Sequence, residues 1–473
     1  MPQRVVSPRV VFTPDGGGPP FMLGPDDQTF YPLARHQGLE ARPEDYRVDA
    51  DGADWIPAIE RAQAAAEVVS YTPGKEYLIS RGIRPVSGKK HRGNRAVLKN
   101  MRTHAKSPYH AAFLLGNIHP AMFKYSPTTA DHLPVHDCAT IAVGHRDINL
   151  SVVGNSAAYA VGQWCVVRTR GELFTSGAYY PHWAQFAKVA ASSAGVVTLD
   201  RPVLDAIASA CISPIGSTTD TYTGTPWAFI EGVEISDFLI DAPDVCSTRS
   251  GASRCEIRGI NLKNADQAFA VNAFLNCSVS DVQGPVTDRM IELKCYSTGN
   301  RFSRFSGHLG ASGTLPPIDI AEQSSRNILE QIVFVVPSSN GNDIECARIG
   351  GRWNVVQDSD LYHLGGAGAP VAAMFGENFV GYGPRGNKLV NTRLTAGAAR
   401  THHIIVGGGP EAAEQPTHYT LQGVETFGVT TSSKSLKVAY GGQGGKLVGC
   451  SLSYGHEIVT GATAPSEAAV SIA

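Results

Sequence analysis

A repeat in the C-terminal half is the sequence feature that most restricts the fold. Asparagine recurs at positions 300, 327, 354 and 387, at steps of 27, 27 and 33 residues, and a short apolar strand follows each one. A second apolar segment begins about 15 to 18 residues later, as in "PIDIA", "DIECA", "PVAAM" and "HHIIV". Units of this length that hold strands and no helix predict a parallel β-solenoid with one coil per unit.

The recurring asparagines have two interpretations. Coils stack at the strand spacing of about 4.8 Å, so amide side chains at one position would hydrogen-bond into a ladder. Alternatively, asparagine stands there because it tolerates the left-handed conformation of a turn. Units before residue 300 fit the scheme less cleanly, and the regular coils are expected from about 226 to 458.

Composition argues against several classes of protein. The 40 basic and 42 acidic residues give a net charge of −2, which disfavours a nucleic-acid partner. No stretch predicts a signal peptide or a membrane span, and no C-x-x-C pair occurs among the nine cysteines. Most of the cysteines are therefore expected to be small buried side chains in a protein made in a reducing cytoplasm.

One helix is predicted in this chain of strands, within residues 49–80. Asp54 can cap its start, and Pro57 falls in the first turn, where the missing N–H costs least. An apolar stripe follows at Trp55, Ile59, Ala62 and Ala66. Because the open end of a solenoid exposes its core and an unpaired strand edge, we expect this helix to cover that end. The acidic residues at 49, 51 and 54 then have structural roles.

The same segment resembles the entry segment of the pectate-lyase-like parallel β-helix proteins, in which an acidic turn precedes a capping helix and a P-G-x-Y strand. The matching residues are Asp51, Gly52, Asp54, Ala58, Ile59, Pro73, Gly74, Tyr77 and Ile79. Segments "VGQWCVVRTR" and "PHWAQFAKVAASSAGVVTLDRPV" are similar to paired strands that many of these proteins carry before the regular coils. The resemblance implies an all-β fold: a right-handed single-stranded parallel β-helix with an N-terminal capping α-helix. It does not specify an activity, because phage tailspikes, polysaccharide lyases and hydrolases share this architecture.

Five segments are predicted along the chain. They are an arm at 1–48 that would suit virion attachment, a capping helix and first coils at 49–135, accessory β-strands at 136–225, the regular β-helix with its glycan site at 226–458, and a tail at 459–473.

Three carboxylates are predicted to form a row on the solenoid. Aligning the inward residues Ile291, Ile318, Ile344 and Val371 places the next residue of each strand outward. The outward residues include Glu292, Asp319 and Glu345, about 5 Å apart between neighbouring strands. Carboxylates this close favour one raised pKa, as the acid and base of glycoside hydrolysis require. The alternatives are a chance alignment of solvated side chains and a Ca²⁺ site.

Further residues are candidates for substrate binding. Lys294 and Arg348 lie beside the row and could orient carboxylate or hydroxyl groups of a substrate. A lyase mechanism would instead use a base and two cations, for which "NRFSRFSGHLG" offers Arg301, Arg304 and His308. The remaining candidates are Asp358, Asp360 and Tyr362 in "VVQDSDLYHL" and the aromatic platform Trp353.

The leading hypothesis is a polysaccharide-cleaving phage tailspike that acts on a bacterial surface glycan. The resemblance implies a homotrimer in the virion, in contact with other tail proteins. One alternative is an extracellular bacterial lyase or glycosidase. The other is a structural or adhesive solenoid without activity. No cofactor is predicted other than the alternative Ca²⁺ site.

Overall fold

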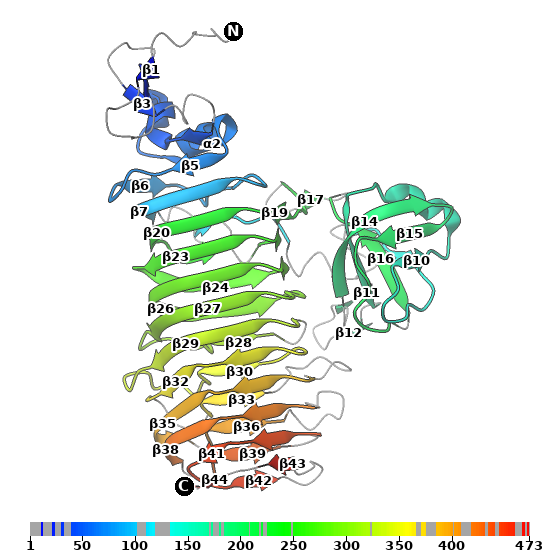
Figure 1. Ribbon diagram of the computed structural model, residues 1–473, viewed down its shortest axis with the longest axis vertical. Coiled ribbons are helices and arrows are strands. Elements are labelled where there is room, and N and C mark those ends of the chain that lie inside the picture. The colour runs from blue at the N-terminus through cyan, green and yellow to red at the C-terminus, as the bar shows by residue number, and fades with distance from the viewer. Residues whose placement is uncertain are drawn as a thin grey trace.

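The computed structural model shows a right-handed parallel β-helix with one helix at its N-terminal end and a small β-sheet domain beside it (Figure 1). This confirms the predicted fold class. The structure describes residues 39–101, 110–118, 133–169, 184–207, 209–216, 225–246, 249–321, 324–365, 370–374, 385–400, 402–407, 418–430, 434–439 and 444–458, and short strands between or beyond these ranges.

Each regular coil contributes three strand segments, and equivalent segments pair in parallel. The first segments are β5 (Val68–Ser70), β7 (Lys90–Asn100), β20 (Glu234–Asp241), β23 (Glu256–Leu262), β26 (Ser278–Lys294), β27 (Arg301–Leu309), β29 (Ile328–Val336), β31 (Val355–Gln357) with β32 (Asp360–His363), β34 (Lys388–Val390) with β35 (Arg393–Arg400), β37 (Thr420–Gln422) with β38 (Glu425–Thr430), and β40 (Lys446–Val448) with β41 (Ser451–Leu452). The second segments are β8 (Ala111–Phe113), β21 (Asp244–Cys246), β24 (Ala265–Asn272), the end of β26, β28 (Ile318–Ile320), β30 (Ala347–Ile349), β33 (Ala372–Met374), β36 (Ile404–Val406), β39 (Leu436–Val438) and β42 (His456–Ile458). The third segments are β19 (Ile230–Glu231), β22 (Ala252–Ser253), β25 (Phe274–Leu275) and single bridges in later coils.

The parallel register stacks like residues inside the solenoid. One buried row consists of Ala41, Val69, His91, Ile235, Ile257, Val279, Phe302, Leu329, Val356, Leu389, Leu421 and Leu447. Apart from His91, every member of this row is apolar. Burial of such a row along the axis supplies much of the favourable free energy of folding.

Each coil turns at residues with left-handed backbone conformation. One column of such residues contains Gly232, Arg254, Asn276, Gly299, Arg326, Trp353, Gly386, His418 and Gly444. We call it the third-strand corner, because it follows the third strand segment of each coil. A second column, within the first segments, contains Asp237, Gly259, Asp281, Arg304, Gln331, Asp358, Asn391, Gly423 and Gly449. At Gly259, with φ 66°, a Cβ would lie 2.5 Å from Asp237 Oδ1, so glycine is favoured there.

The repeated asparagines form a buried ladder. Asn300 Nδ2 donates to Asn327 Oδ1 at 2.9 Å, and Asn327 Nδ2 donates to Asn354 Oδ1 at 3.0 Å. At the 33-residue step the backbone N–H of Asn354 still donates to Asn387 Oδ1 at 2.9 Å, but Asn354 Nδ2 donates to the carbonyl oxygens of Ser324 and Gly350. None of the four has a positive φ, so the ladder interpretation is confirmed and the turn interpretation is wrong.

Replacing one rung should be costly. In Asn327→Ala the backbone N–H of Asn300 loses its acceptor at 3.1 Å inside the solenoid, so we expect a loss of about 2 kcal/mol or more in unfolding free energy by chemical denaturation. Asn264→Ala is the matched control: Asn264 is exposed and donates to Asp241 Oδ1 at 2.7 Å, so its loss should cost about 1 kcal/mol or less. Equal effects of the two substitutions would contradict a structural role for the ladder.

Helix α2 (Ile56–Ala65) covers the N-terminal end of the solenoid, as predicted (Figure 1). Pro57 lies in its first turn, and Ile59, Ala62 and Ala66 are buried in the core. Asp54 accepts from the backbone N–H of Ile56 at 3.1 Å and from the hydroxyl of Ser80 at 2.6 Å. It therefore joins the start of the helix to the end of strand β6 (Glu76–Ile79).

Two predicted boundaries are wrong. The arm does not extend to residue 48, because β4 (Glu40–Ala41) pairs with β5 and Lys75 Nζ lies 2.9 Å from Glu44 Oε1. The structure places β1 (Val11–Phe12), β2 (Phe21–Leu23) and β3 (Phe30–Pro32) in the rest of the arm, and its other residues lie outside the described residues. The coils also continue past residue 458, since β43 (Ser466–Ala468) and β44 (Ser471–Ile472) pair in parallel with β40 and β41.

A buried histidine fastens the helix to the first coil. His91 Nε2 lies 3.1 Å from Gln63 Oε1 of α2, and His91 Nδ1 lies 3.1 Å from the Tyr71 hydroxyl. A carbonyl oxygen only accepts, so Nε2 carries the proton and Nδ1 accepts from Tyr71, which is the neutral form of the ring. Burial lowers the pKa of His91 to about 3.

His91 should make stability depend on pH. Its folded pKa lies below the unfolded value, so the unfolded state binds the proton first and stability falls as the pH drops from about 6.5 towards 3. We expect His91→Gln to remove about 1.4 kcal/mol per pH unit from the slope of unfolding free energy in this window. Denaturant unfolding at several pH values measures the slopes, and parallel slopes for both proteins would refute the assignment.

A small antiparallel domain is inserted between two coils. Its six-stranded sheet has the order β10-β15-β14-β11-β16-β9, and its own apolar core includes Val167, Val189 and Ile212. The strands are β9 (His136–Asp137), β10 (Asp147–Asn149), β11 (Trp164–Thr169), β14 (Ala184–Ser193), β15 (Val196–Leu199) and β16 (Ala210–Pro214). Strand β7 pairs directly with β20, so the coils continue without interruption across the insertion.

Aromatic and charged contacts dock this inserted domain on the solenoid. Trp164 stacks on Phe229 with ring centroids 4.4 Å apart, and Trp164 Nε1 donates to Glu231 Oε1 at 3.1 Å. Lys188 Nζ lies 2.5 Å from the same carboxylate, and Phe186 packs edge-on against Phe229. The buried apolar surface and the shared carboxylate hold the domain in one position beside the coils.

Candidate functional site

The structure brings only part of the predicted carboxylate row into register. Glu292 and Asp319 are direct partners on neighbouring strands, as predicted. The prediction for Glu345 is wrong, because Asp319 pairs with Arg348 and not with Glu345. The segment "DIECARIG" offers two apolar alternations, and the strand uses Ala347 and Ile349, which leaves Glu345 before the strand, 3.2 Å from Arg348.

The row is also buried and not exposed, which is a second correction. Glu292 is 1% exposed and Asp319 is 6% exposed. Arg289 forms an ion pair with Glu292 and lies 3.6 Å from Asp319 Oδ2, while Lys294 Nζ lies 2.6 Å from Glu292 Oε1. Burial lowers the pKa of Arg289, and the nearby Asp319 opposes this effect. Through these ion pairs the two carboxylates hold the buried guanidinium of Arg289 in place, and Glu292 also holds the half-exposed Lys294.

Removing the central cation should be strongly destabilising. In Arg289→Met the buried carboxylate of Glu292 keeps only Lys294, so we expect a loss of about 3 to 5 kcal/mol in unfolding free energy. The surface control Arg258→Met, whose side chain is 58% exposed, should cost less than about 1 kcal/mol. The double variant Arg289→Met/Glu292→Leu should recover most of the loss, and failure to do so would contradict an ion-pair origin.

A second group of carboxylates, which the sequence interpretation missed, extends from two preceding coils onto the coil of Glu292. Asp244 is 6% exposed, and burial together with nearby Asp266 raises its pKa to about 7. Asp266 accepts from the Thr287 hydroxyl at 2.8 Å, and Asp288 accepts from the Gln267 amide at 2.9 Å. In the strand register Asp244 pairs with Gln267, and Gln267 pairs with Arg289, so Asp266 and Asp288 each stand one residue before the aligned position.

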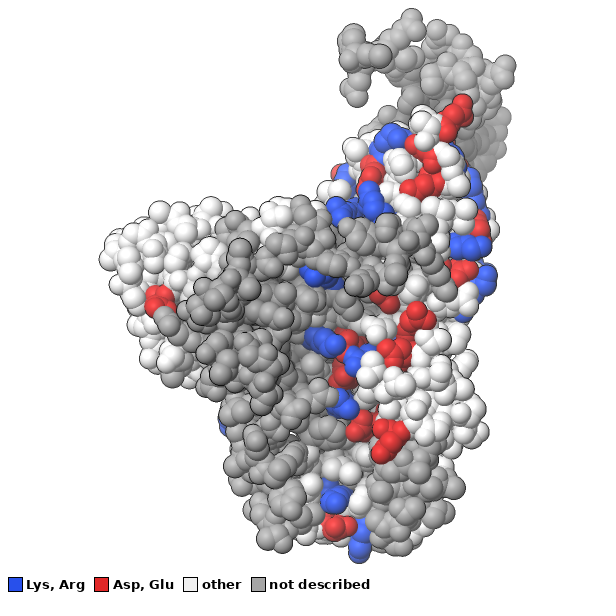
Figure 2. Space-filling view, turned by 180° about the vertical axis from the view of Figure 1, so that it is seen from behind, with Lys and Arg blue, Asp and Glu red and all other residues white. Residues whose placement is uncertain are grey.

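These two groups form one feature, which we call the charged strip. It consists of Asp244, Asp266, Asp288, Arg289, Glu292, Lys294, Asp319 and Arg348. Figure 2 shows acidic and basic side chains interleaved along the back of the solenoid, among the residues that it describes. A carboxyl group with a pKa near neutral pH, beside further carboxyl groups, can perform general acid and base catalysis.

The predicted lyase residues are not gathered into one site. Arg301 Nε lies 2.6 Å from Glu330 Oε1, and Arg304 Nε lies 2.6 Å from Asp281 Oδ1. Arg304 sits at a corner with φ 57°, which breaks the expected alternation between the two arginines. His308 is exposed farther along the same strand. The two cations are therefore engaged by separate carboxylates.

The "VVQDSDLYHL" group is also split. Asp358 occupies a left-handed corner and accepts from Asn391 Nδ2 at 3.1 Å, so it does not share a face with Asp360. Asp360 is paired with Arg393 through two bonds of 2.5 and 2.8 Å, and Tyr362 lies on the outward side of β32. Trp353 lies elsewhere, on the third-strand corner, with 39% of its surface exposed.

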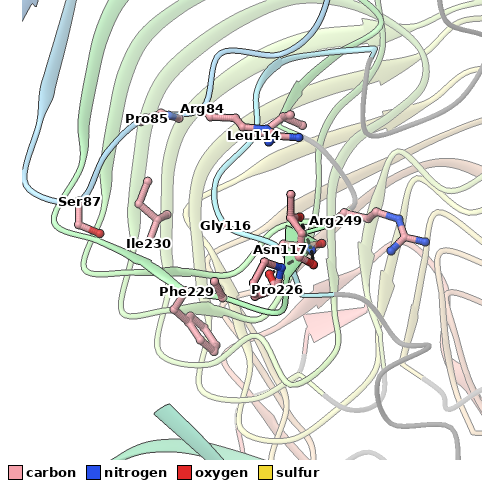
Figure 3. A pocket seen from close by; sticks show the side chains of 12 residues that line it. Arg84, Pro85, Ser87, Leu114, Gly116, Asn117, Pro226, Phe229, Ile230 and Arg249 are labelled. Carbon is pink, nitrogen blue, oxygen red and sulfur yellow. Dashed lines mark hydrogen bonds between the residues drawn. The ribbon is translucent and has the colours of Figure 1, made fainter. Parts of the chain in front are cut away.

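A cavity of about 340 Å³ lies where the chain leaves the solenoid for the inserted domain. Leu114, Phe229 and Ile230 line it, and Asn117 closes one side by donating to Thr225 Oγ1 at 3.1 Å (Figure 3). The guanidinium of Arg249 points away from its centre in this view. Among the described residues that line this cavity there is no carboxylate, so this lining does not suit glycan hydrolysis.

Other sequence-based expectations can be compared with the described residues. Eight of the nine cysteines are buried, as expected, and Cys138 is partly exposed. Within the described ranges, no three His, Cys, Asp or Glu side chains are placed to share a metal ion. No described helix has the length and apolar character needed to cross a bilayer.

The class of protein that this fold defines is the parallel β-helix, and solved members with the same architecture include phage tailspikes. The gp54 tailspike of Acinetobacter baumannii bacteriophage AP22, solved with a capsular saccharide, matches at a TM-score of 0.51 and 10% identity over 93% of this chain and 76% of that one. The gp49 tailspike of Pseudomonas phage LKA1 matches at 0.51 and 13% identity over 88% and 74%. The A-module of the mannuronan C-5 epimerase AlgE6 of Azotobacter vinelandii matches at 0.47 and 11% over 91% and 99%. No family model matches the sequence.

Proposed function

We propose that the protein binds a bacterial surface polysaccharide and hydrolyses it, as a phage tailspike would. One observation carries the proposal: Asp244, a carboxyl group with a pKa of about 7, is held beside further carboxylates on the coils of a β-helix. The shared fold with a tailspike solved in complex with a capsular saccharide supports a glycan as the class of ligand.

The charged strip offers the two groups that glycoside hydrolysis needs. Asp244 is the general acid, which donates its proton to the glycosidic oxygen as the bond from that oxygen to the anomeric carbon breaks. Asp288 is the general base, which takes a proton from the water that attacks the anomeric carbon. The bond from Gln267 Nε2 to Asp288 Oδ2, 2.9 Å long, orients this carboxylate.

The predicted carboxylate row has a different role in this proposal. Glu292 and Asp319 position Arg289 and, through Glu292, Lys294. The Lys294 side chain is 42% exposed, so it can meet an anionic group of the substrate. The lyase alternative is less well supported, because Arg301 and Arg304 are bound to separate carboxylates.

The proposed setting is the virion. A tailspike of this kind would act as a homotrimer, contact other tail proteins and reach the glycan on the host surface. A virion location distinguishes this proposal from that of an enzyme exported by a bacterium. Sizing of the purified protein and its detection in purified phage particles would test these parts.

Glycan cleavage should depend on Asp244 and Asp288. The full chain is incubated with capsular polysaccharides and lipopolysaccharides, and new reducing ends are measured together with absorbance from unsaturated uronates. Reducing ends without that absorbance are expected, with a loss of about 100-fold or more in Asp244→Asn and Asp288→Asn. The rate should fall above about pH 7, because the acid then loses its proton.

Asp281→Asn is the matched control, since Asp281 is an exposed aspartate bound to Arg304 at a corner away from the strip. It should keep the wild-type rate. If the Asp244→Asn protein were active and the Asp319→Asn protein inactive, the catalytic residues would lie in the predicted carboxylate row and not at Asp244. Absence of cleavage of every glycan would contradict the hydrolase proposal.

A further inference from the structure

A second cavity lies between the inserted domain and the solenoid. Its volume is about 370 Å³, within the range of small-molecule sites. One wall comes from the inserted domain and the other from three successive coils at the third-strand corner. We call this cavity the corner cleft, and its lining includes Gln185, Arg201, Asn276, Thr298, Ser325 and Arg326.

The solenoid wall presents hydrogen-bonding groups on successive coils. The hydroxyls of Thr298 and Ser325 lie 3.2 Å apart, so they are linked along the solenoid axis. Asn276 is exposed one coil earlier, and Arg326 follows Ser325 at the corner with φ 56°. Among the described residues, no carboxylate forms an ion pair with Arg326, although neighbouring arginines at this corner have partners. A partly buried guanidinium of this kind suits a carboxylate supplied by a ligand.

The opposite wall is held in place by its own bonds. Arg201 forms two bonds of 3.0 and 2.9 Å with Asp200, and Gln185 uses both ends of its amide on Pro202 and Leu204. Phe186 and Leu204 add apolar surface to this wall. The cleft is therefore preorganised, and its one uncommitted cation is Arg326 within the described residues.

An aromatic platform continues the cleft on the next coil. Ser325 and Arg352 form a parallel bridge, which places Trp353 directly after Arg326 along the corner. Trp353 is 39% exposed and packs over Gly386, where a Cβ would lie 2.0 Å from the ring. Such a half-exposed indole, fixed on one side, offers a face for the apolar side of a sugar ring.

We propose that the corner cleft binds an acidic oligosaccharide whose chain runs along the solenoid axis. The carboxylate of one sugar pairs with Arg326, its hydroxyl groups bond to Asn276, Thr298 and Ser325, and a neighbouring sugar stacks on Trp353. This site is separate from the charged strip, and it rests on the proposed function only in taking a carbohydrate as the ligand. It implies that the polysaccharide carries carboxylate groups.

Binding to defined oligosaccharides tests the inference. The probes are hexasaccharides of polygalacturonate and polymannuronate, with maltohexaose as the neutral control, added to the full chain carrying Asp244→Asn so that cleavage does not consume them. Calorimetry and saturation-transfer NMR measure binding. We expect an acidic probe to bind at least about tenfold more tightly than maltohexaose, and Arg326→Gln to weaken that binding about tenfold.

Matched variants make the result specific. Arg326→Lys should bind with intermediate affinity, because it keeps the charge and loses the two-pronged geometry. Trp353→Ala should weaken binding of all probes that bind, while Arg258→Gln, on another surface, should change nothing. Unchanged melting temperatures confirm that the variants fold.

Three results would overturn the inference: no binding of either acidic probe, equal binding of acidic and neutral probes, or unchanged binding in Arg326→Gln. Glycan cleavage by the Arg326→Gln and Asp244→Asn proteins is measured separately with the reducing-end assay. Probe binding by a wild-type chain that cleaves none of the capsular polysaccharides and lipopolysaccharides would overturn the hydrolase proposal alone. If the wild-type chain cleaves a glycan but Arg326→Gln binds the acidic probes as tightly as the parent protein, only the corner-cleft proposal is overturned.

Discussion

The in-register parallel pairing of each coil with the next is the constraint on which the rest of the structure depends. A slip of one residue would exchange the inward and outward side chains of a strand, and the buried row from Ile235 to Leu447 makes such a slip costly. The same register places Asn300, Asn327 and Asn354 within hydrogen-bonding distance of each other. It also stacks left-handed residues into corners, so the positions of both proposed sites follow from the pairing of the coils.

The ion pairs at the centre of the charged strip are not explained by stability. Replacing a buried ion pair with apolar side chains of similar size is often neutral or stabilising, whereas removing one partner is costly. Glu292 and Arg289 are both below 10% exposed, so burying this ion pair costs desolvation free energy. On the preceding coil the position that pairs with Glu292 is Ala270, so a small apolar side chain fits there. A functional role for this polar cluster is the simpler explanation, and it agrees with the raised pKa of Asp244 beside it.

Much of the fold could be predicted from the sequence, because the signals were local and repeated. The asparagine period gave the coil length, and Pro57 with the Ile59 stripe located the capping helix. The site was harder to predict. Glu345 was misplaced because "DIECARIG" has two apolar alternations, and only the pairing of Asp319 with Arg348 decides between them. Asp244 was missed because its pKa depends on burial and on Asp266 of the next coil, which no local pattern contains.

The charged strip and the corner cleft share two coils, which has a consequence for a polymeric substrate. Lys294 of the strip and Thr298 of the cleft are four residues apart on one coil, and Asp319 and Ser325 are six apart on the next. The inserted domain is docked through Trp164 and Glu231, so the cleft keeps its place relative to the strip. A polysaccharide repeats the same sugar many times, so a segment held in the cleft raises the local concentration of further segments at the strip. Weak binding of single sugars is then compatible with efficient capture of a long chain.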